Sequence, residues 1–274
     1  MKAALFERLS VSGEKKMELT NELQGQLLDC ILDMGQLLLG CGAEISRVED
    51  TLTRVGRAYG AAETDVFVIT SIISLTMEFP GHEAVTETRR IVRDDGTDFY
   101  RLEKLNALSR AVCAEPVEVD ELRARIDAVA AGRKPFRVQL FGSILAAGSF
   151  AVFFGGSVWD GLAAAVLGAL ICLLQLRLDR TEINTVARNL LVSFLIGVAA
   201  ELLTAAIPAL HMDKILIGDI MLLIPGLAMT NAIRNVLVGN TISGVVRLTA
   251  SLIWAAALAG GFMTAMVITD LLMR

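Results

Sequence analysis

The sequence has few of the residues that usually build metal centres, disulfide frameworks and nucleotide sites. It contains two histidines and four cysteines, and the cysteines do not follow the CxxC or Cys/His spacing that is typical of zinc sites. His82 and His211 are therefore interpreted as isolated surface residues. A Gly-Lys-Ser/Thr phosphate loop is also absent, which argues against an ATP-driven pump subunit. We expect no catalytic residues, no metal and no cofactor.

Aromatic residues are also scarce, at 5%, whereas hydrophobic residues make up 54% and the mean hydropathy is +0.58. This composition is too apolar for an ordinary soluble domain and predicts insertion into a lipid bilayer. Acidic residues are concentrated in residues 1–132, while the remainder carries more basic than acidic side chains. An acidic half argues against nucleic acid as a partner, because proteins that bind it present basic surfaces.

The apolar residues divide the chain near Pro135. We expect an N-terminal tail at 1–19, a cytoplasmic α+β domain at 20–132 and a membrane domain at 133–274. Five apolar stretches are about 20 residues long, the length that crosses the hydrocarbon core of a bilayer. They lie at 137–155, 159–176, 190–208, 215–238 and 246–269. The predicted fold class is a mostly α-helical membrane protein, with a small α+β N-terminal domain before about five transmembrane helices.

Lysine and arginine residues predict the orientation of these helices. They flank the start of the first stretch and the connections after the second and fourth stretches, whereas the other two connections carry at most one. Because short cytoplasmic loops are enriched in basic residues, we expect a cytoplasmic N-terminus and an external C-terminus. Residues 1–20 are charged and lack an apolar core, so they do not resemble a cleaved signal peptide.

Helical and strand periodicities predict the cytoplasmic domain. Helices are expected at 20–41, 44–59, 99–113 and 119–131, with a strand or strand pair at 64–79 and a further strand at 84–93. Polar side chains form a row along the second of these helices, at Glu44, Arg47, Thr51 and Arg54. This row is either a solvated face with i,i+3 and i,i+4 pairs or part of a site.

The third apolar stretch contains an acidic residue, Glu201, which shares a helix face with Ser193, Gly197 and Thr204. An ionised carboxylate facing lipid at such a depth costs about 2.5–3.5 kcal/mol. We therefore expect Glu201 to face protein or a wet cavity. It is either a proton-coupling group or a protonated side chain that bonds a neighbouring helix.

The fourth stretch contains a Pro-Gly pair where a continuous helix is expected. Proline removes a backbone donor and glycine tolerates irregular backbone, and such breaks persist in membranes where they are buried in protein or line an aqueous path. We expect proton coupling through Asp219 or Glu201, and substrate binding through Pro225, Gly226, Asn231, Arg234 and Asn235. The alternative is a simple proline kink, with the arginine snorkelling to lipid headgroups.

Several of these segments together resemble the threonine/serine exporter family. They are Gly42-Ala43-Glu44 with Val48-Glu49, Thr88-Arg89-Arg90, and Ile224-Pro225-Gly226 through Arg234-Asn235 to Gly239 and Arg247. The resemblance covers nearly the whole chain. It implies export of small metabolites across the bacterial inner membrane, either threonine and serine or dicarboxylates such as succinate. We add Glu44, Arg47 and Arg89 as candidate functional residues of the cytoplasmic domain.

Full-length members of that family carry a further membrane portion, so a chain with five spans resembles the split type. The resemblance then implies a hetero-oligomer with a small companion membrane subunit, and higher oligomers are possible. Besides this subunit, the expected partners are lipid and a small carboxylate-bearing solute. Two other functions stay open: a membrane-anchored hydrolase that uses the polar row, and a scaffold or sensor without transport. The polar break in the fourth stretch favours the exporter.

Overall fold

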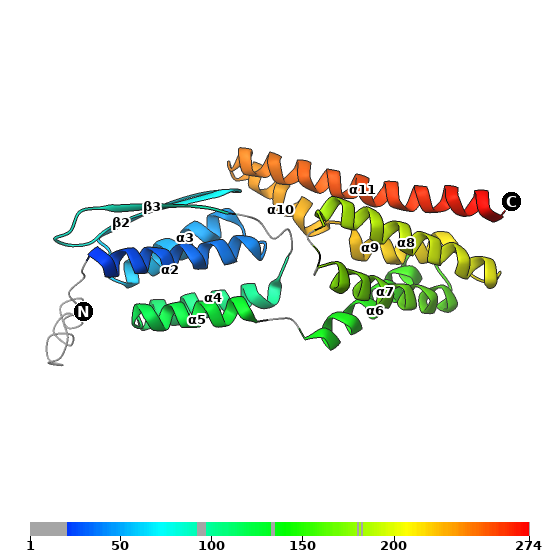
Figure 1. Cartoon of the computed structure of the whole chain (residues 1–274), viewed down its shortest axis with the longest axis horizontal. Helices are drawn as coiled ribbons and strands as arrows, with labels where there is room; N and C mark the ends of the chain where they lie inside the picture. The colour runs from blue at the N-terminus through cyan, green and yellow to red at the C-terminus, as the bar shows by residue number, and fades with distance from the viewer. Residues whose placement is uncertain (1–20, 92–96, 133–134, 180, 182, 274) are drawn as a thin grey trace.

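The computed structural model describes residues 21–91, 97–132, 135–179, 181 and 183–273. The chain forms two units that lie end to end along the long axis, an N-terminal unit with a small sheet and a bundle of long helices (Figure 1). The predicted tail at 1–19 lies outside the described residues. The prediction of a mostly helical membrane protein with a small α+β N-terminal unit is confirmed.

The N-terminal unit has three layers: a sheet, a pair of helices beneath it and a second pair beneath those (Figure 1). The elements are α2 (Asn21–Gly40), α3 (Ile45–Ala58), β1 (Glu63–Ile69), β2 (Ile72–Glu78), β3 (Val85–Arg90), α4 (Phe99–Ala114) and α5 (Val119–Ala131). All three strands pair antiparallel in the order β1-β2-β3. The segment expected as a strand or strand pair is thus a hairpin.

Buried and exposed side chains alternate along the central strand, β2, and this alternation explains how the sheet covers the helices. Ile73, Leu75 and Met77 on β2 are fully buried and join the same apolar core as the middle layer. The residues between them face away, and Ser74 forms a hydroxyl pair with Thr88 across β2 and β3. This period-2 pattern fixes the register, because a slip by one residue would expose the apolar face.

The bundle of long helices begins after Pro135. Its helices are α6 (Phe136–Phe153), α7 (Val158–Leu178), α8 (Thr185–Ala206), α9 (Met212–Leu223), α10 (Gly226–Leu237) and α11 (Thr241–Met273). Four of them are long and apolar enough to cross a membrane, and α9 with α10 gives a fifth span if that bent pair crosses as one. The expected fourth span is therefore two helices that meet at an angle of 52°.

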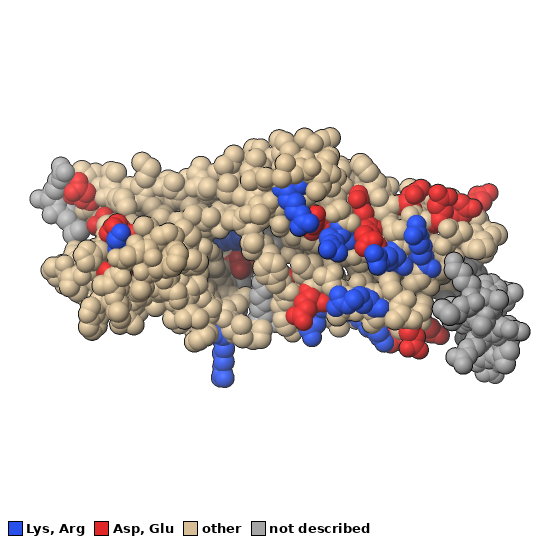
Figure 2. Space-filling model, turned by 180° about the vertical axis from the view of Figure 1, so that it is seen from behind, with Lys and Arg blue, Asp and Glu red and all other residues tan. Residues whose placement is uncertain are grey.

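Two features make this bundle suited to lipid. Large apolar side chains are exposed along its outside, among them Phe141, Leu162 and Leu252. On the face that Figure 2 shows, charged side chains gather over the N-terminal unit, and most of the bundle is uncharged. Inside, small residues let the helices approach closely, which is how membrane helices gain packing energy in the absence of a hydrophobic driving force.

One such approach lies between α6 and α9, next to the bend. A Cβ atom placed on Gly218 would lie 2.5 Å from the Ala147 carbonyl oxygen and 2.9 Å from the Ala151 Cβ atom. A side chain at this position therefore requires the two helices to move apart. This contact holds α9 at a fixed depth beside α6.

We predict that Gly218→Ala lowers the thermal unfolding midpoint of the purified chain in detergent micelles, because overpacking costs about 1–3 kcal/mol. The matched control is Gly142→Ala on α6, where a Cβ atom would meet nothing within 4 Å. That variant should unfold at or slightly above the wild-type midpoint, since alanine is the better helix former. Equal midpoints for the two variants would contradict the close α6–α9 contact.

Candidate functional site

The bend between α9 and α10 is a true interruption of the helix. Helix α9 ends at Leu223, Ile224 is extended with φ −61° and ψ 130°, and α10 begins at Gly226. Because Pro225 has no N–H, the carbonyl four residues earlier, on Met221, loses its usual helical donor. The backbone here needs partners from outside the helix.

These interrupted residues line a cavity of about 720 Å³ between the two units, which we call the junction cavity. The N-terminal unit contributes Leu39, Gly42 and Thr97, and the bundle contributes all residues from Met221 to Ala228. The lining is completed by α7, α8, α10 and α11 through Gln175, Asp179, Thr185, Arg188, Asn189, Asn231, Arg247, Ala250, Ser251 and Trp254. Irregular backbone in a membrane protein is tolerated in such surroundings.

Two arginines give the junction cavity a basic character. Arg188 on α8 pairs with Asp179 at the end of α7, whereas Arg247 projects from the second turn of α11 and is only 6% exposed. The Ser251 hydroxyl donates a hydrogen bond of 2.9 Å to the Arg247 carbonyl oxygen. Asn231, on α10, adds an amide that is half-buried. The cavity can therefore offer several donors to a carboxylate or phosphate oxygen.

The predicted substrate residues are divided by the structure. Pro225, Gly226 and Asn231 line the junction cavity, but Arg234 and Asn235 are not among its lining residues. The Arg234 side chain is 59% exposed and its Nη1 atom lies 3.2 Å from an oxygen of Glu44. Asn235 is fully buried, and its amide has no hydrogen-bond partner among the described residues.

Sequence reasoning missed Arg188, Asn189 and Arg247 as cavity residues. In the sequence, Arg188 and Arg247 indicate which connections lie in the cytoplasm, and Arg247 also belongs to the segments that resemble the exporter family. The signal that could have identified Arg247 is the spacing to Ser251, which places two polar side chains one turn apart inside an apolar helix. Arg188 and Asn189 lie just after a connection, where polar residues are common. The sequence around them therefore shows no polar pair inside an apolar helix that would single them out.

The two predicted proton-coupling residues lie in different surroundings. Asp219 on α9 is fully buried, and neither carboxyl oxygen has a hydrogen-bond partner in the part of the chain that the structure describes. Glu201 is partly exposed and lies near the end of α8 that is remote from the junction cavity. No hydrogen bond joins the two carboxyls in the described part of the chain, and Asp219 is the one enclosed by the bundle.

His211 lies at the surface, as predicted, with a side chain that is 64% exposed, but the prediction that it is isolated is wrong. Asp160, at the start of α7, is fully buried and accepts a bond of 2.7 Å from the His211 backbone N–H. It also lies 3.1 Å from the His211 ring nitrogen Nδ1 and forms a capping box with Ser157. These bonds join the α6–α7 and α8–α9 connections, which a reading of single residues could not anticipate.

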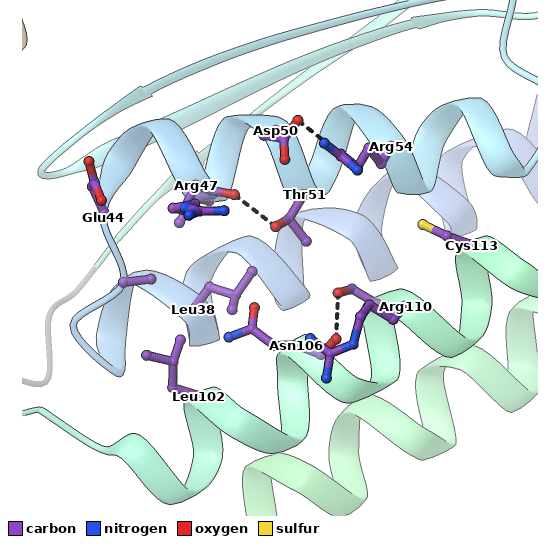
Figure 3. A pocket seen from close by; sticks show the side chains of 13 residues that line it. Leu38, Glu44, Arg47, Asp50, Thr51, Arg54, Leu102, Asn106, Arg110 and Cys113 are labelled. Carbon is purple, nitrogen blue, oxygen red and sulfur yellow. Dashed lines mark hydrogen bonds and ion pairs between the residues drawn. The ribbon is translucent and has the colours of Figure 1, made fainter. Parts of the chain in front are cut away.

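The three candidates in the N-terminal unit are also separated. Glu44 and Arg47 line a second cavity of about 490 Å³ between α3 and α4, which we call the α3–α4 cleft (Figure 3). Arg89, on β3, instead pairs with Asp29 and Asp33 of α2. Arg89 therefore fastens the sheet to α2, and the polar row on α3 faces a cleft.

The fold and the junction cavity together define a multi-pass helical membrane protein with a polar cavity at a broken helix. A family model described as a threonine/serine exporter matches residues 29–269. The chain therefore belongs to the threonine/serine exporter family.

One curated relative is the "Probable threonine/serine exporter" of Mycobacterium tuberculosis (strain ATCC 25618 / H37Rv). It is 24% identical to this chain over 250 residues, which cover 87% of this chain and 45% of the relative. The chain thus spans about half the length of that relative. No solved structure matches the chain.

The Glu44–Arg234 ion pair generates a prediction about how the two units are joined. Replacing Glu44 by Gln, Arg234 by Gln, or both should give non-additive changes in the free energy of unfolding. We expect a coupling energy of about 0.2–1 kcal/mol that weakens as salt is added, because the pair is partly exposed. Thermal or denaturant unfolding of the four proteins measures it, and additive changes at low salt would contradict the pairing.

Proposed function

We propose that the chain is one subunit of a secondary exporter that moves small carboxylate-bearing metabolites out of the cell through the junction cavity. The observation that carries this proposal is the placement of Arg247 and Asn231 beside an interrupted membrane helix. Arg247 is buried in the wall of this cavity, and ionisable residues inside membrane bundles typically mark substrate or ion pathways. A solute carboxylate is a partner that arginine can bind bidentately.

The interrupted helix supports the same role for its backbone. The first residues of α10, from Gly226 to Ala228, line the junction cavity, and the N–H groups at a helix N-terminus favour anions. The last residues of α9 line it as well, and the carbonyls at a helix C-terminus favour cations. Both ends of a zwitterionic amino acid thus find a complementary partner at the break. This favours threonine or serine over a dicarboxylate such as succinate.

Asp219 is the residue that we propose for proton coupling, in preference to Glu201. Asp219 lies on α9, before the break, whereas Asn231 lies on α10, after the break. Ionisable residues enclosed in membrane bundles are typical proton-relay groups. The burial of the Asp219 carboxyl therefore supports a path for protons that is separate from the cavity where the solute binds.

The remaining features of the exporter are also proposals. We propose that a small companion membrane subunit completes the passage, and that the subunits can assemble into higher oligomers. The basic connections support placement in the bacterial inner membrane with the N-terminal unit in the cytoplasm. The junction cavity then opens on the cytoplasmic side, where solute for export is collected.

A hydrolase in the N-terminal unit receives no support from the cleft that would have to contain it. The lining of the α3–α4 cleft includes one cysteine, Cys113, and no histidine. Burial raises the pKa of the Cys113 thiol, which lowers the fraction of reactive thiolate. A nucleophile without an adjacent base cannot be activated for hydrolysis in the usual way.

Transport in proteoliposomes that contain the chain and its companion subunit tests the exporter. Arg247→Gln should lower L-threonine flux at least about tenfold, because a charge-assisted bond contributes about 1.5–3 kcal/mol. The control is Arg177→Gln on α7, whose side chain is exposed and does not line the junction cavity. Equal flux in both variants, at equal protein levels, would contradict the solute site. Parallel assays with succinate decide between the two solute classes.

Proton coupling is tested separately in the same vesicles. Asp219→Asn should remove the dependence of net L-threonine efflux on a pH gradient, while exchange of labelled for unlabelled L-threonine continues. Asp213→Asn, which alters an exposed acid on the same helix, should leave the pH dependence intact. If Glu201→Gln removes the dependence and Asp219→Asn does not, the assignment to Asp219 is wrong.

A further inference from the structure

The α3–α4 cleft is a second cavity of ligand size, and it lies in the N-terminal unit, apart from the junction cavity. Its volume of about 490 Å³ is within the range of small-molecule sites, about 300–1,000 Å³. Helix α3 forms one wall and α4 the other, and Leu38 of α2 lies behind them (Figure 3). The transport function proposed above makes no use of this cleft.

Three arginines line the cleft, and they differ in what they already bind. Arg54 donates to Asp50 at 2.9 Å, so its guanidinium is already neutralised locally. Arg47 on α3 and Arg110 on α4 have no ion pair or side-chain hydrogen bond among the described residues. Two guanidinium groups without carboxylate partners thus belong to opposite walls of one cavity.

We propose that the α3–α4 cleft binds a small molecule that carries one carboxylate and a neighbouring hydroxyl or amino group. Arg47 and Arg110 supply the donors for the carboxylate, because a guanidinium matches the geometry of two carboxylate oxygens. The proposal does not depend on which solute the membrane bundle transports. It concerns a cytoplasmic-side ligand of the N-terminal unit.

Charge and hydrogen-bonding groups select this chemistry. The lining contains three arginines and two carboxylates, Glu44 and Asp50. Their net formal charge of +1 is balanced by a single carboxylate, whereas a phosphate dianion would leave an excess of negative charge in the cleft. The Asn106 side chain lines the cleft between the arginines and offers a donor and an acceptor. The Ser109 hydroxyl donates to the Asn106 carbonyl oxygen at 3.0 Å, so its own lone pairs stay open to a ligand donor.

Glu44 connects this site to the bundle. It lines the α3–α4 cleft, precedes α3 as its N-cap residue, and pairs with Arg234 of α10 at 3.2 Å. Without Arg234, the negative charge of Glu44 would no longer be neutralised, and it would repel an anionic group in the cleft. The occupancy of the cleft and the position of α10 are therefore coupled, and by linkage the coupling is reciprocal.

Isothermal titration of the full chain in lipid nanodiscs tests the site, with L-threonine, succinate and inorganic phosphate as probes. The Arg247→Gln background weakens binding at the junction cavity, so that the remaining heat reports on the cleft. We expect L-threonine to bind, and we expect Arg47→Gln and Arg110→Gln each to weaken that binding at least about tenfold. The control is Arg57→Gln, an exposed residue of α3 that does not line the cleft.

Three results would overturn the site: no heat with L-threonine, binding that Arg47→Gln and Arg110→Gln leave unchanged, or binding of phosphate in place of L-threonine. Unfolding midpoints equal to that of the background protein show that a variant is folded. Arg234→Gln, which lies outside the cleft, should weaken L-threonine binding by a factor of about five or more if the coupling has the usual size. Unchanged affinity in this variant would overturn the link through Glu44.

Discussion

The interruption of the fourth span at Pro225 is the constraint on which the architecture depends. A membrane offers no water to backbone carbonyls, so a helix can end there only where protein or a wet cavity supplies partners. Residues 221–228 meet this requirement by lining the junction cavity. The 52° bend then separates α9, which carries the enclosed Asp219, from α10, which carries Asn231. A single proline thus creates both the cavity and the two-sided arrangement around it.

The same interruption explains why the N-terminal unit lies against the bundle. The junction cavity is incomplete without Leu39, Gly42 and Thr97, which cover it from outside the bundle. Gly42 adopts a φ of +85°, a conformation that glycine accepts without strain, and this turn leads directly to Glu44 and its partner Arg234. The N-terminal unit is therefore part of the wall of the cavity rather than a separate tethered domain.

Much of the fold could be predicted because it follows from periodicity within single elements. Alternating residues such as Ile73 and Leu75 define the hairpin, and the long apolar runs define the spans. Helix α11 begins at Thr241 rather than at residue 246, because Gly239, with a φ of +96°, ends the preceding helix within a shorter connection than expected.

The site was only partly predictable, because it joins residues that are remote in sequence. Pro225, Gly226 and Asn231 carry a local signal, the break itself, and they line the junction cavity. Arg234 carries the same local signal but contacts Glu44, and nothing in the sequence indicates that α10 meets the start of α3. Asp160 and His211 show the same limit, since their bond joins two connections that lie far apart in the chain.

The positions of the charged residues around the break also limit how solute binding and proton transfer can be coupled in the proposed mechanism. Arg247 and Asn231 lie on the side of the N-terminal unit, whereas Asp219 is enclosed by the bundle and does not line the junction cavity. A direct ion pair between solute and Asp219 is therefore excluded in this conformation. In the proposed mechanism, coupling between the solute and Asp219 passes through movement of α9 relative to α6, and the close contact at Gly218 allows little gradual displacement. Packed contacts of this kind shift between discrete arrangements, which is the behaviour that alternating access requires.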